Sequence, residues 1–213
     1  ANTSNFMIGG RGTSYGFTGS MSQLCLFDYD LSSAQVSSLY NSGSPINPMT
    51  LKPAPIASYL LGGDASTGGN ATLSVPNVAV PDASVFEFDA SNNEKITANN
   101  ITSLNTGDLS ASIWVYATNS GNNIEYLFDN SNALAQAGFT ISINSSNGYA
   151  WYIGRATTTH QYVVSNVNIN FINNVWNHLC FSYNDTTKAF VLYLNGNSVN
   201  SGTATSVTKS PST

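Results

Sequence analysis

The chain has few charged residues, few cysteines and no long hydrophobic run. Asp, Glu, Lys and Arg make up 8% of its 213 residues, against roughly a quarter in average soluble domains. Six Lys and Arg residues face eleven acids, for a net charge of −5, so no basic surface is available for phosphates and nucleic-acid binding is disfavoured. No apolar run approaches the roughly 18 residues of a membrane-spanning helix, so membrane insertion is not expected.

The only cysteines, Cys25 and Cys180, lie in the apolar, strand-like runs LCLF and HLCF. Two thiols cannot define a disulfide framework, and free cysteine is among the most buried residue types. We therefore expect two buried thiols. Asn, Ser, Thr and Gly carry the polar surface in place of charge, and this composition suits an extracellular or particle-surface β protein.

Short strands with alternating apolar residues dominate the chain. Gly, Asn, Asp and Ser separate them, as turns require, and many short strands are typical of a sandwich or barrel. The clearest strands are VFEFD (85–89), LSASIWVYA (109–117), GFTISIN (138–144), NGYAWYIG (147–154), WNHLCFSYN (176–184) and KAFVLYLNG (188–196). The segment LSSAQVSSLYNSG (31–43) has apolar residues near helical spacing instead, with Ser32 or Ser33 to cap it and Gly43 to end it. This segment predicts one short helix.

Segments along nearly the whole chain resemble those of laminin G-like domains. GSMSQLCLFDYDLSSAQVSSLYNSG (19–43) is similar to the closing strand and helix of that family, and FMIGGRG (6–12) to the strand before them. PIASYLLGGDASTGG (55–69) resembles the opening strand, while VFEFDAS, LSASIWVYA, WNHLCFSYN and VLYLNG resemble middle strands. The resemblance implies an all-β, two-sheet antiparallel jelly-roll sandwich of the concanavalin A-like lectin type, with one short helix.

The order of these segments departs from the family, because the closing motif comes first. In one arrangement, residues 1–213 form one sandwich in permuted order, in which 1–43 supplies the closing strands and helix, 44–54 is a proline-rich linker, and 55–213 supplies the opening and middle strands. In the other, 1–43 ends one tandem repeat and 55–213 begins the next, so that neighbouring copies of the domain are partners. The motif style also resembles tandem-domain virion structural proteins of marine phages.

Some enzymes share this sandwich, so a glucanase has to be considered. Glucanases need a nucleophile and an acid/base carboxylate, carried in this fold on an E-x-D-x-x-E strand. The nearest match here has Glu87 and Asp89, but Asn92 stands at the third position. His160 and His178 are the only histidines, and no G-x-S-x-G motif accompanies them. We therefore expect no catalytic residues and no enzymatic activity.

Calcium is the one cofactor that the resemblance raises, and it needs six to eight oxygen ligands. Asp64 in GGDAS stands where such folds place an acid after the first strand, and it is the candidate ligand. The closing strand of the family usually offers an Asp-Glu pair, but Ser22 and Gln23 stand there in this chain. No cofactor is therefore expected, and calcium at Asp64 stays an open alternative.

Aromatic side chains gather on the strand faces that alternation turns away from the apolar core. Their rings combine apolar faces with polar tips, which suits a sugar ring. We therefore predict a ligand-binding surface for a glycan or cell-surface carbohydrate, while packing of these aromatics under loops stays an alternative. Its residues are Trp114, Tyr116, Tyr152, Trp176, His178 and Tyr193.

The function predicted from the sequence is a non-enzymatic carbohydrate-binding or adhesion module of a virion surface protein, in a fibre, spike or capsid decoration. The alternative is a purely structural repeat unit of an extracellular or virion fibre. Binding of the isolated protein to sugars separates the two.

Overall fold

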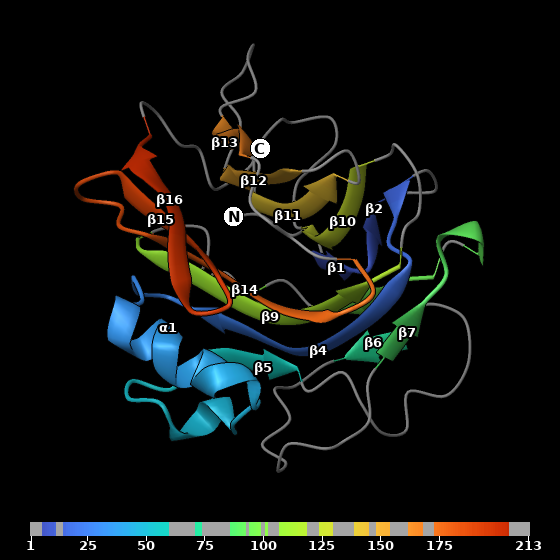
Figure 1. Cartoon of the computed structure of the whole chain (residues 1–213), viewed down its shortest axis with the longest axis horizontal. Helices are drawn as coiled ribbons and strands as arrows, with labels where there is room; N and C mark the ends of the chain where they lie inside the picture. Colours follow the sequence, from blue (N-terminus) through green and yellow to red (C-terminus); the bar gives the residue numbers. More distant parts are fainter. Residues whose placement is uncertain are drawn as a thin grey trace.

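The protein is a sandwich of two sheets with one helix packed on the outside. The computed structural model describes residues 6–11, 15–59, 71–73, 86–92, 94–98, 101, 107–118, 124–129, 139–144, 148–153, 162–167 and 173–204. In this part of the chain, two seven-stranded sheets pack face to face, and helix α1 lies against the outer side of one of them (Figure 1). The all-β sandwich with one short helix is thus confirmed.

In sheet 1, six strands pair antiparallel in a row, and the seventh strand, at the end, runs parallel to its neighbour. Its order is β13 (Tyr162–Val167), β12 (Gly148–Ile153), β11 (Phe139–Asn144), β10 (Ile124–Asp129), β1 (Phe6–Ile8), β8 (Ile96–Ala98) and β6 (Ala71–Leu73). Strands β6 and β8 run parallel, which departs from the purely antiparallel sheet expected from the sequence.

Sheet 2 is antiparallel throughout the described residues. Its order is β16 (Asn197–Thr203), β15 (Ala189–Leu194), β14 (Trp176–Tyr183), β9 (Leu109–Ala117), β4 (Gly19–Phe27) and β5 (Ala57–Tyr59), with β7 (Phe86–Phe88) also paired to β4. A small pair, β2 (Gly10–Arg11) and β3 (Tyr15–Gly16), stands beside the two sheets. Three 3₁₀ turns complete the described elements: η1 (Asn41–Gly43), η2 (Pro48–Thr50) and η3 (Ala90–Asn92).

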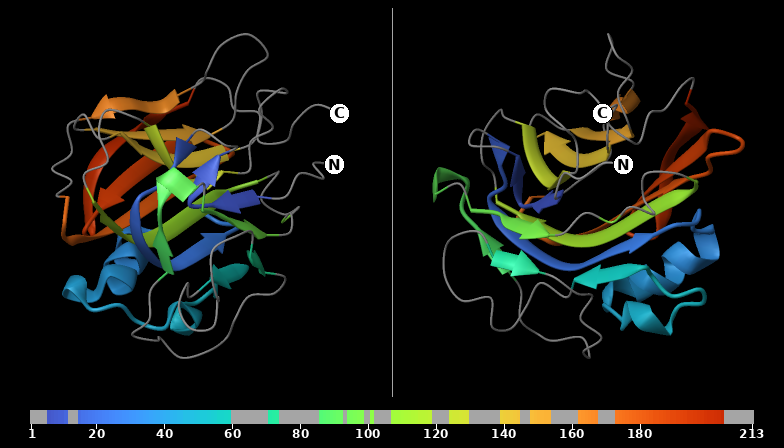
Figure 2. Two further views of the ribbon diagram at one scale, coloured as in Figure 1. Left: turned by 90° about the vertical axis from the view of Figure 1, so that its right-hand side faces the viewer. Right: turned by 180° about the vertical axis from the view of Figure 1, so that it is seen from behind.

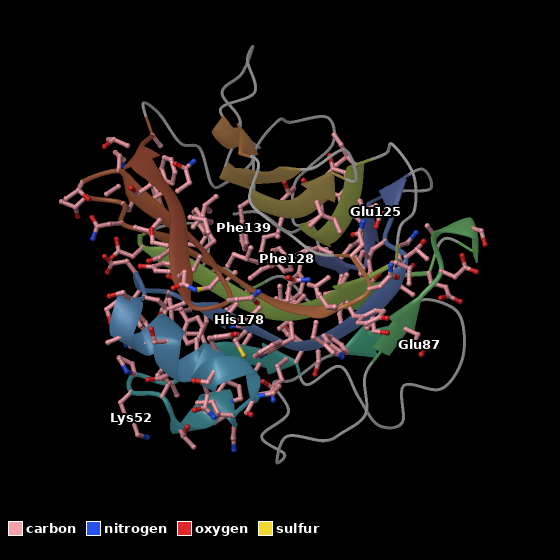
Figure 3. The ribbon with its side chains drawn as sticks, viewed as in Figure 1. Lys52, Glu87, Glu125, Phe128, Phe139 and His178 are labelled. Atoms are coloured by element: carbon pink, nitrogen blue, oxygen red, sulfur yellow. The ribbon has the colours of Figure 1, made fainter. Side chains whose placement is uncertain are left out.

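The hydrophobic core lies between the two sheets and follows the alternation of the strands. On β9, Leu109, Ile113 and Val115 face it, as predicted, and Phe181 of β14 does the same. Aromatic rings fill the side of sheet 1: the ring centroids of Phe128 and Phe139, labelled in Figure 3, are 4.7 Å apart. Burial of such apolar side chains is the main favourable term in the folding free energy.

The first 43 residues supply inner strands to both sheets. Strand β4 pairs with β9 along one edge, and with β5 and β7 along the other. Strand β1 lies between β10 and β8. Figure 2 shows β4 and β9 side by side as long curved strands in both of its views. Residues near the start of the chain are therefore hydrogen-bonded into the middle of a sandwich whose other strands come much later.

Helix α1 (Ser33–Tyr40) occupies the segment for which a helix was predicted. Ser32 is its N-cap, and the backbone N–H of Gln35 donates to the Ser32 hydroxyl at 3.3 Å in a capping box. The left-handed residue that ends the helix is Asn41 (φ 42°), two positions before the expected Gly43. Asparagine tolerates this conformation better than most residues. In the described part of the chain, no helix has the length and apolar character of a membrane span.

Candidate functional site

The outer face of sheet 2, which points away from sheet 1, carries five of the six residues predicted to bind a ligand. Helix α1 and the segment after it cover only one part of this face (Figures 1 and 2). We call that part the covered half, and define it by the side chains that pack beneath or beside α1. They are Cys25, Phe27, Trp114, His178, Cys180 and Tyr193.

The helix is anchored on the covered half by two apolar residues and one aromatic ring. Val36 and Leu39 are buried in a cluster with Phe27 and Tyr193. Tyr40, at the end of the helix, stacks on Trp114 with ring centroids 5.8 Å apart. These contacts make the covered half a second, smaller hydrophobic core.

Gly196, in the turn between β15 and β16, lets the end of α1 come this close. A Cβ at this position would lie 2.7 Å from Cδ1 of Tyr40, and its φ of +76° is a conformation that L side chains rarely adopt. Tyr40 therefore lies between the Gly196 turn on one side and Trp114 with His178 on the other.

His178 is fully buried in the covered half and serves as a structural residue there. Its ring lies 5.0 Å from that of Trp114, and its Nε2 is 2.8 Å from the Ser112 hydroxyl. Burial lowers the pKa of His178 to about 3, so the imidazole is neutral at physiological pH. Its Nδ1 has no hydrogen-bond partner. Figure 3 shows His178 between the strands and α1.

Three of the predicted ligand-binding residues are therefore inaccessible at the surface. Trp114, His178 and Tyr193 retain exposed fractions of 4%, 0% and 5%. The prediction of their direction was right, since all three point away from the main core. The prediction of an accessible surface was wrong for them, because α1 packs on the same face. The alternative of aromatic packing holds for this half.

The sixth predicted residue, Tyr152, lies in the other sheet. It belongs to β12 of sheet 1, where it pairs with Thr140 of β11. The outer faces of the two sheets point to opposite sides of the sandwich. A single outer surface made of all six residues is thus excluded. The sequence could not show this, because alternation distinguishes inward from outward positions but does not say which sheet a strand joins.

Beyond the covered half, four paired residues lie in a row on the outer face of sheet 2. Trp176 of β14 is opposite Tyr116 of β9, Tyr116 is opposite Ser20 of β4, and Ser20 is opposite Glu87 of β7. Directly paired residues share one face of a sheet, so the four side chains form a line across the strands. We call this line the open row.

The open row combines an exposed aromatic ring with polar groups. Trp176 is 39% exposed, one of two large hydrophobic side chains exposed in the described part of the chain. Tyr116 and Ser20 are half-buried, Glu87 is exposed, and the rings of Trp176 and Tyr116 are 5.8 Å apart at an angle of 60°. Figure 3 shows Glu87 on β7, toward the end of the sheet away from α1.

The acids that matched a glucanase motif show no paired arrangement. Asp89 accepts hydrogen bonds from the Ser91 hydroxyl at 2.7 Å and from the Ser91 backbone at 2.8 Å. These bonds hold the pKa of Asp89 below its ordinary value. A general acid needs the opposite, a pKa raised toward the working pH. Asp89 acts as the cap of the turn η3.

The acid with a clearly raised pKa, Glu125, lies elsewhere. It is buried in β10 of sheet 1, opposite the core residue Ile143, and accepts a hydrogen bond from the backbone of Thr18 at 3.4 Å. Burial raises its pKa to about 7. It shares neither strand nor sheet with Glu87, so the two carboxylates do not form a catalytic pair on the open row.

The predicted calcium ligand Asp64 lies outside the described residues. Ser22 and Gln23 stand at a bulge of β4, where its pairing with β9 shifts register. Among the described residues, no group of three or more His, Cys, Asp or Glu side chains could hold a metal ion. Cys25 and Cys180 are both buried free thiols, as predicted, and burial raises the pKa of Cys25 to about 12.

The alternation in the sequence predicts Trp176 and Tyr116 as residues of a binding surface, but no pattern predicts the polar end of the open row as part of that surface. Glu87 was considered only as part of an enzyme motif, and Ser20 was not singled out. The signal available was the F-E-F alternation around Glu87, which turns its side chain away from the core. The register of β7 against β4 places Glu87 in line with Trp176, and no pattern in the sequence predicts this register.

A laminin G-type family model, described as the concanavalin A-like lectin/glucanases superfamily, matches residues 90–213. The match covers more than half of the chain and includes β9, β14 and β15. It does not extend to β4, α1 or β7. No curated protein and no solved structure matches the chain.

Proposed function

The chain belongs to the concanavalin A-like lectin/glucanases superfamily, and from this premise we propose that it is a non-enzymatic carbohydrate-binding module. The binding surface in this proposal is the open row on the outer face of sheet 2. The observation that carries it is the exposed Trp176, which lies beside Tyr116 in a row that is otherwise polar.

Aromatic and hydroxyl groups suit sugars for a physical reason. A pyranose ring has apolar C–H faces and polar edges, so it packs on an aromatic ring while its hydroxyls bond to neighbouring polar groups. Tyr116 and Ser20 offer hydroxyls next to the aromatic surface. Packing of a sugar ring on the exposed Trp176 removes apolar surface of both from water, which contributes favourable free energy.

Binding without hydrolysis is supported by the state of the nearby acids. Glu87 is exposed, Asp89 is held as a turn cap by Ser91, and Asn92 replaces the third acid of the glucanase motif. Release of reducing sugar from β-glucans by the pure protein, abolished by Glu87→Gln, would contradict the proposal.

The setting that we propose is an extracellular or virion surface. The low charge and the Asn-, Ser- and Thr-rich composition support it, as does the resemblance of the motifs to those of tandem-domain virion structural proteins. The full-length gene product should then carry further copies of this domain. A single copy fused to an intracellular enzyme would contradict this setting.

The experiment is a glycan array followed by titration of the best sugar. Trp176→Ala should weaken binding about tenfold, since an aromatic contact contributes on the order of 1–2 kcal/mol and 1.4 kcal/mol is one decade. Val175→Ala is the matched control, because Val175 is the exposed neighbour at 42% and lies outside the open row. Equal affinities of the two variants, or no sugar binding by the wild-type protein, would favour a purely structural repeat unit.

A further inference from the structure

Glu87 places a negative charge at one end of the open row. The carboxylate is exposed, and it lies three strand positions away from Trp176, with Tyr116 and Ser20 between them. Neighbouring strands are about 4.8 Å apart, so the row spans roughly 14 Å from β14 to β7. This length exceeds one sugar ring and suits a short oligosaccharide lying across the strands.

The groups in the row are acceptors, hydroxyls and rings, and none is cationic. An ionised carboxylate accepts hydrogen bonds strongly from hydroxyl donors and offers two oxygens to them. Sugar hydroxyls are such donors. A carboxylate or sulfate on a glycan would instead bring a like charge toward Glu87 without a compensating cation in the row, and the net charge of −5 adds to the repulsion.

We infer that the open row binds a neutral oligosaccharide, which extends from Trp176 across Tyr116 to Glu87, and that Glu87 discriminates against acidic glycans. The inference rests on the proposed function, since it concerns the same surface. Trp176 supplies the affinity common to all sugars in this arrangement. Glu87 supplies selectivity, because a like charge left without a counter-charge destabilises the complex with an acidic competitor.

The arrangement also predicts how affinity depends on length. A monosaccharide stacked on Trp176 does not reach Glu87 across two intervening strands. Affinity should therefore rise with the number of sugar units until the row is filled and then stay constant. Substitution of Glu87 should weaken the long oligomers and leave the monosaccharide unchanged.

The experiment uses the wild-type protein, Glu87→Gln and Asp28→Asn on an array that pairs neutral oligosaccharides with uronate, sialylated or sulfated forms of the same cores. Asp28 is exposed directly after β4 and lies outside the open row, so its variant removes the same charge elsewhere. We expect the wild-type protein and Asp28→Asn to bind each neutral core about tenfold or more better than its acidic form. Glu87→Gln should bring the two forms within a few fold.

Each other result contradicts the inference in a recognisable way. Equal or better binding of acidic forms by the wild-type protein overturns it, and so does an unchanged preference in Glu87→Gln. If either result is found while Trp176→Ala still weakens binding, the proposed function stands and only the role of Glu87 fails. If Trp176→Ala has no effect, or no glycan binds, the proposed function fails and the inference falls with it.

Discussion

The covered half and the open row belong to the same face of the same sheet, yet one is a packed core and the other is a surface. Trp114 and Tyr116 are two residues apart on β9 and point the same way, and Trp176 and His178 stand in the same relation on β14. Within each pair, one side chain is buried against α1 or its neighbours, and the other remains in the open row.

The difference between the two halves arises outside the strands that carry these residues. Strands β9 and β14 have no change of composition that would mark the boundary. The boundary is where α1 ends, at Tyr40 against the Gly196 turn. The role of an aromatic residue on this face is thus decided by a helix that lies more than 70 positions away from Trp114 in the chain.

Deletion of the segment that supplies α1 and the inner strands should have the largest effect on the protein. We propose that residues 1–43 close the sandwich of their own chain, because β1 and β4 lie between strands from 57–129. Deletion of 1–43 leaves unpaired strand edges in both sheets, so residues 44–213 should show no cooperative thermal unfolding. Circular dichroism during heating measures this.

The matched control for this deletion keeps every residue and changes only their order. A permuted chain that runs from 44 to 213 and continues into 1–43 should unfold cooperatively and bind the same glycans. A truncated chain that unfolds near the wild-type midpoint would show that 1–43 is dispensable, which would favour its assignment to a neighbouring repeat.

A milder change loosens the covered half alone. Leu39→Ala removes a buried side chain of α1 and should lower the free energy of unfolding by about 2–4 kcal/mol. Ser37→Ala, on the exposed side of the same helix, should change it by less than about 0.5 kcal/mol. Glycan affinity of folded Leu39→Ala should stay within about twofold of wild type. A small stability loss, equal to that of the control, would mean that α1 does not seal this half.

The free energy of unfolding should also depend on pH, more weakly, through two buried groups in opposite sheets. The pKa of Glu125 is raised to about 7 by burial, so its favourable contribution is complete below about pH 4.5 and is lost as pH rises through 7. The pKa of His178 is lowered to about 3, so its contribution is complete above about pH 6.5 and is lost as pH falls. The two slopes oppose each other between these limits.

Glu125→Gln should isolate the slope of His178. Relative to wild type, this variant should gain stability as pH rises from 4.5 to 7, on the order of 1–3 kcal/mol, and the gain should be constant above 7. Urea denaturation at a series of pH values measures it, with Asp28→Asn as the control for loss of an exposed charge. A pH-independent difference between Glu125→Gln and wild type would rule out the burial of an ionisable Glu125.

Much of the fold could be predicted from the sequence, because alternation depends on local chemistry. Alternation correctly predicted the strand at 109–117 with its bounds and the core-facing side chains of β14 and β15. Apolar residues at helical spacing and a serine cap predicted the helix. Strand β10 was not predicted. Its residues 124–129 include a position, between Tyr126 and Phe128, where the register shifts, and such an irregularity interrupts the alternation that marks a strand.

The site could be predicted only in part, because it depends on relations between distant segments. Alternation predicted that Trp176 and Tyr152 point away from the core, but it could not show that the two residues belong to different sheets. It also could not show that α1 packs over Trp114 and leaves Tyr116 uncovered. The pairing of Ser20 with both Tyr116 and Glu87 joins three distant parts of the chain, and no local pattern records it.

Substitution of two tryptophans tests whether one face of sheet 2 is divided into a structural half and a ligand-binding row. Trp114→Ala should lower the free energy of unfolding by about 3–5 kcal/mol. Trp114→Phe is the milder variant that keeps the fold. Either variant, while folded, should bind glycans with wild-type affinity. Trp176→Ala should change stability by less than about 1 kcal/mol and lower glycan affinity about tenfold. If Trp114→Phe weakens binding as much as Trp176→Ala does, or if Trp176→Ala is as destabilising as Trp114→Ala, the division of this face is contradicted.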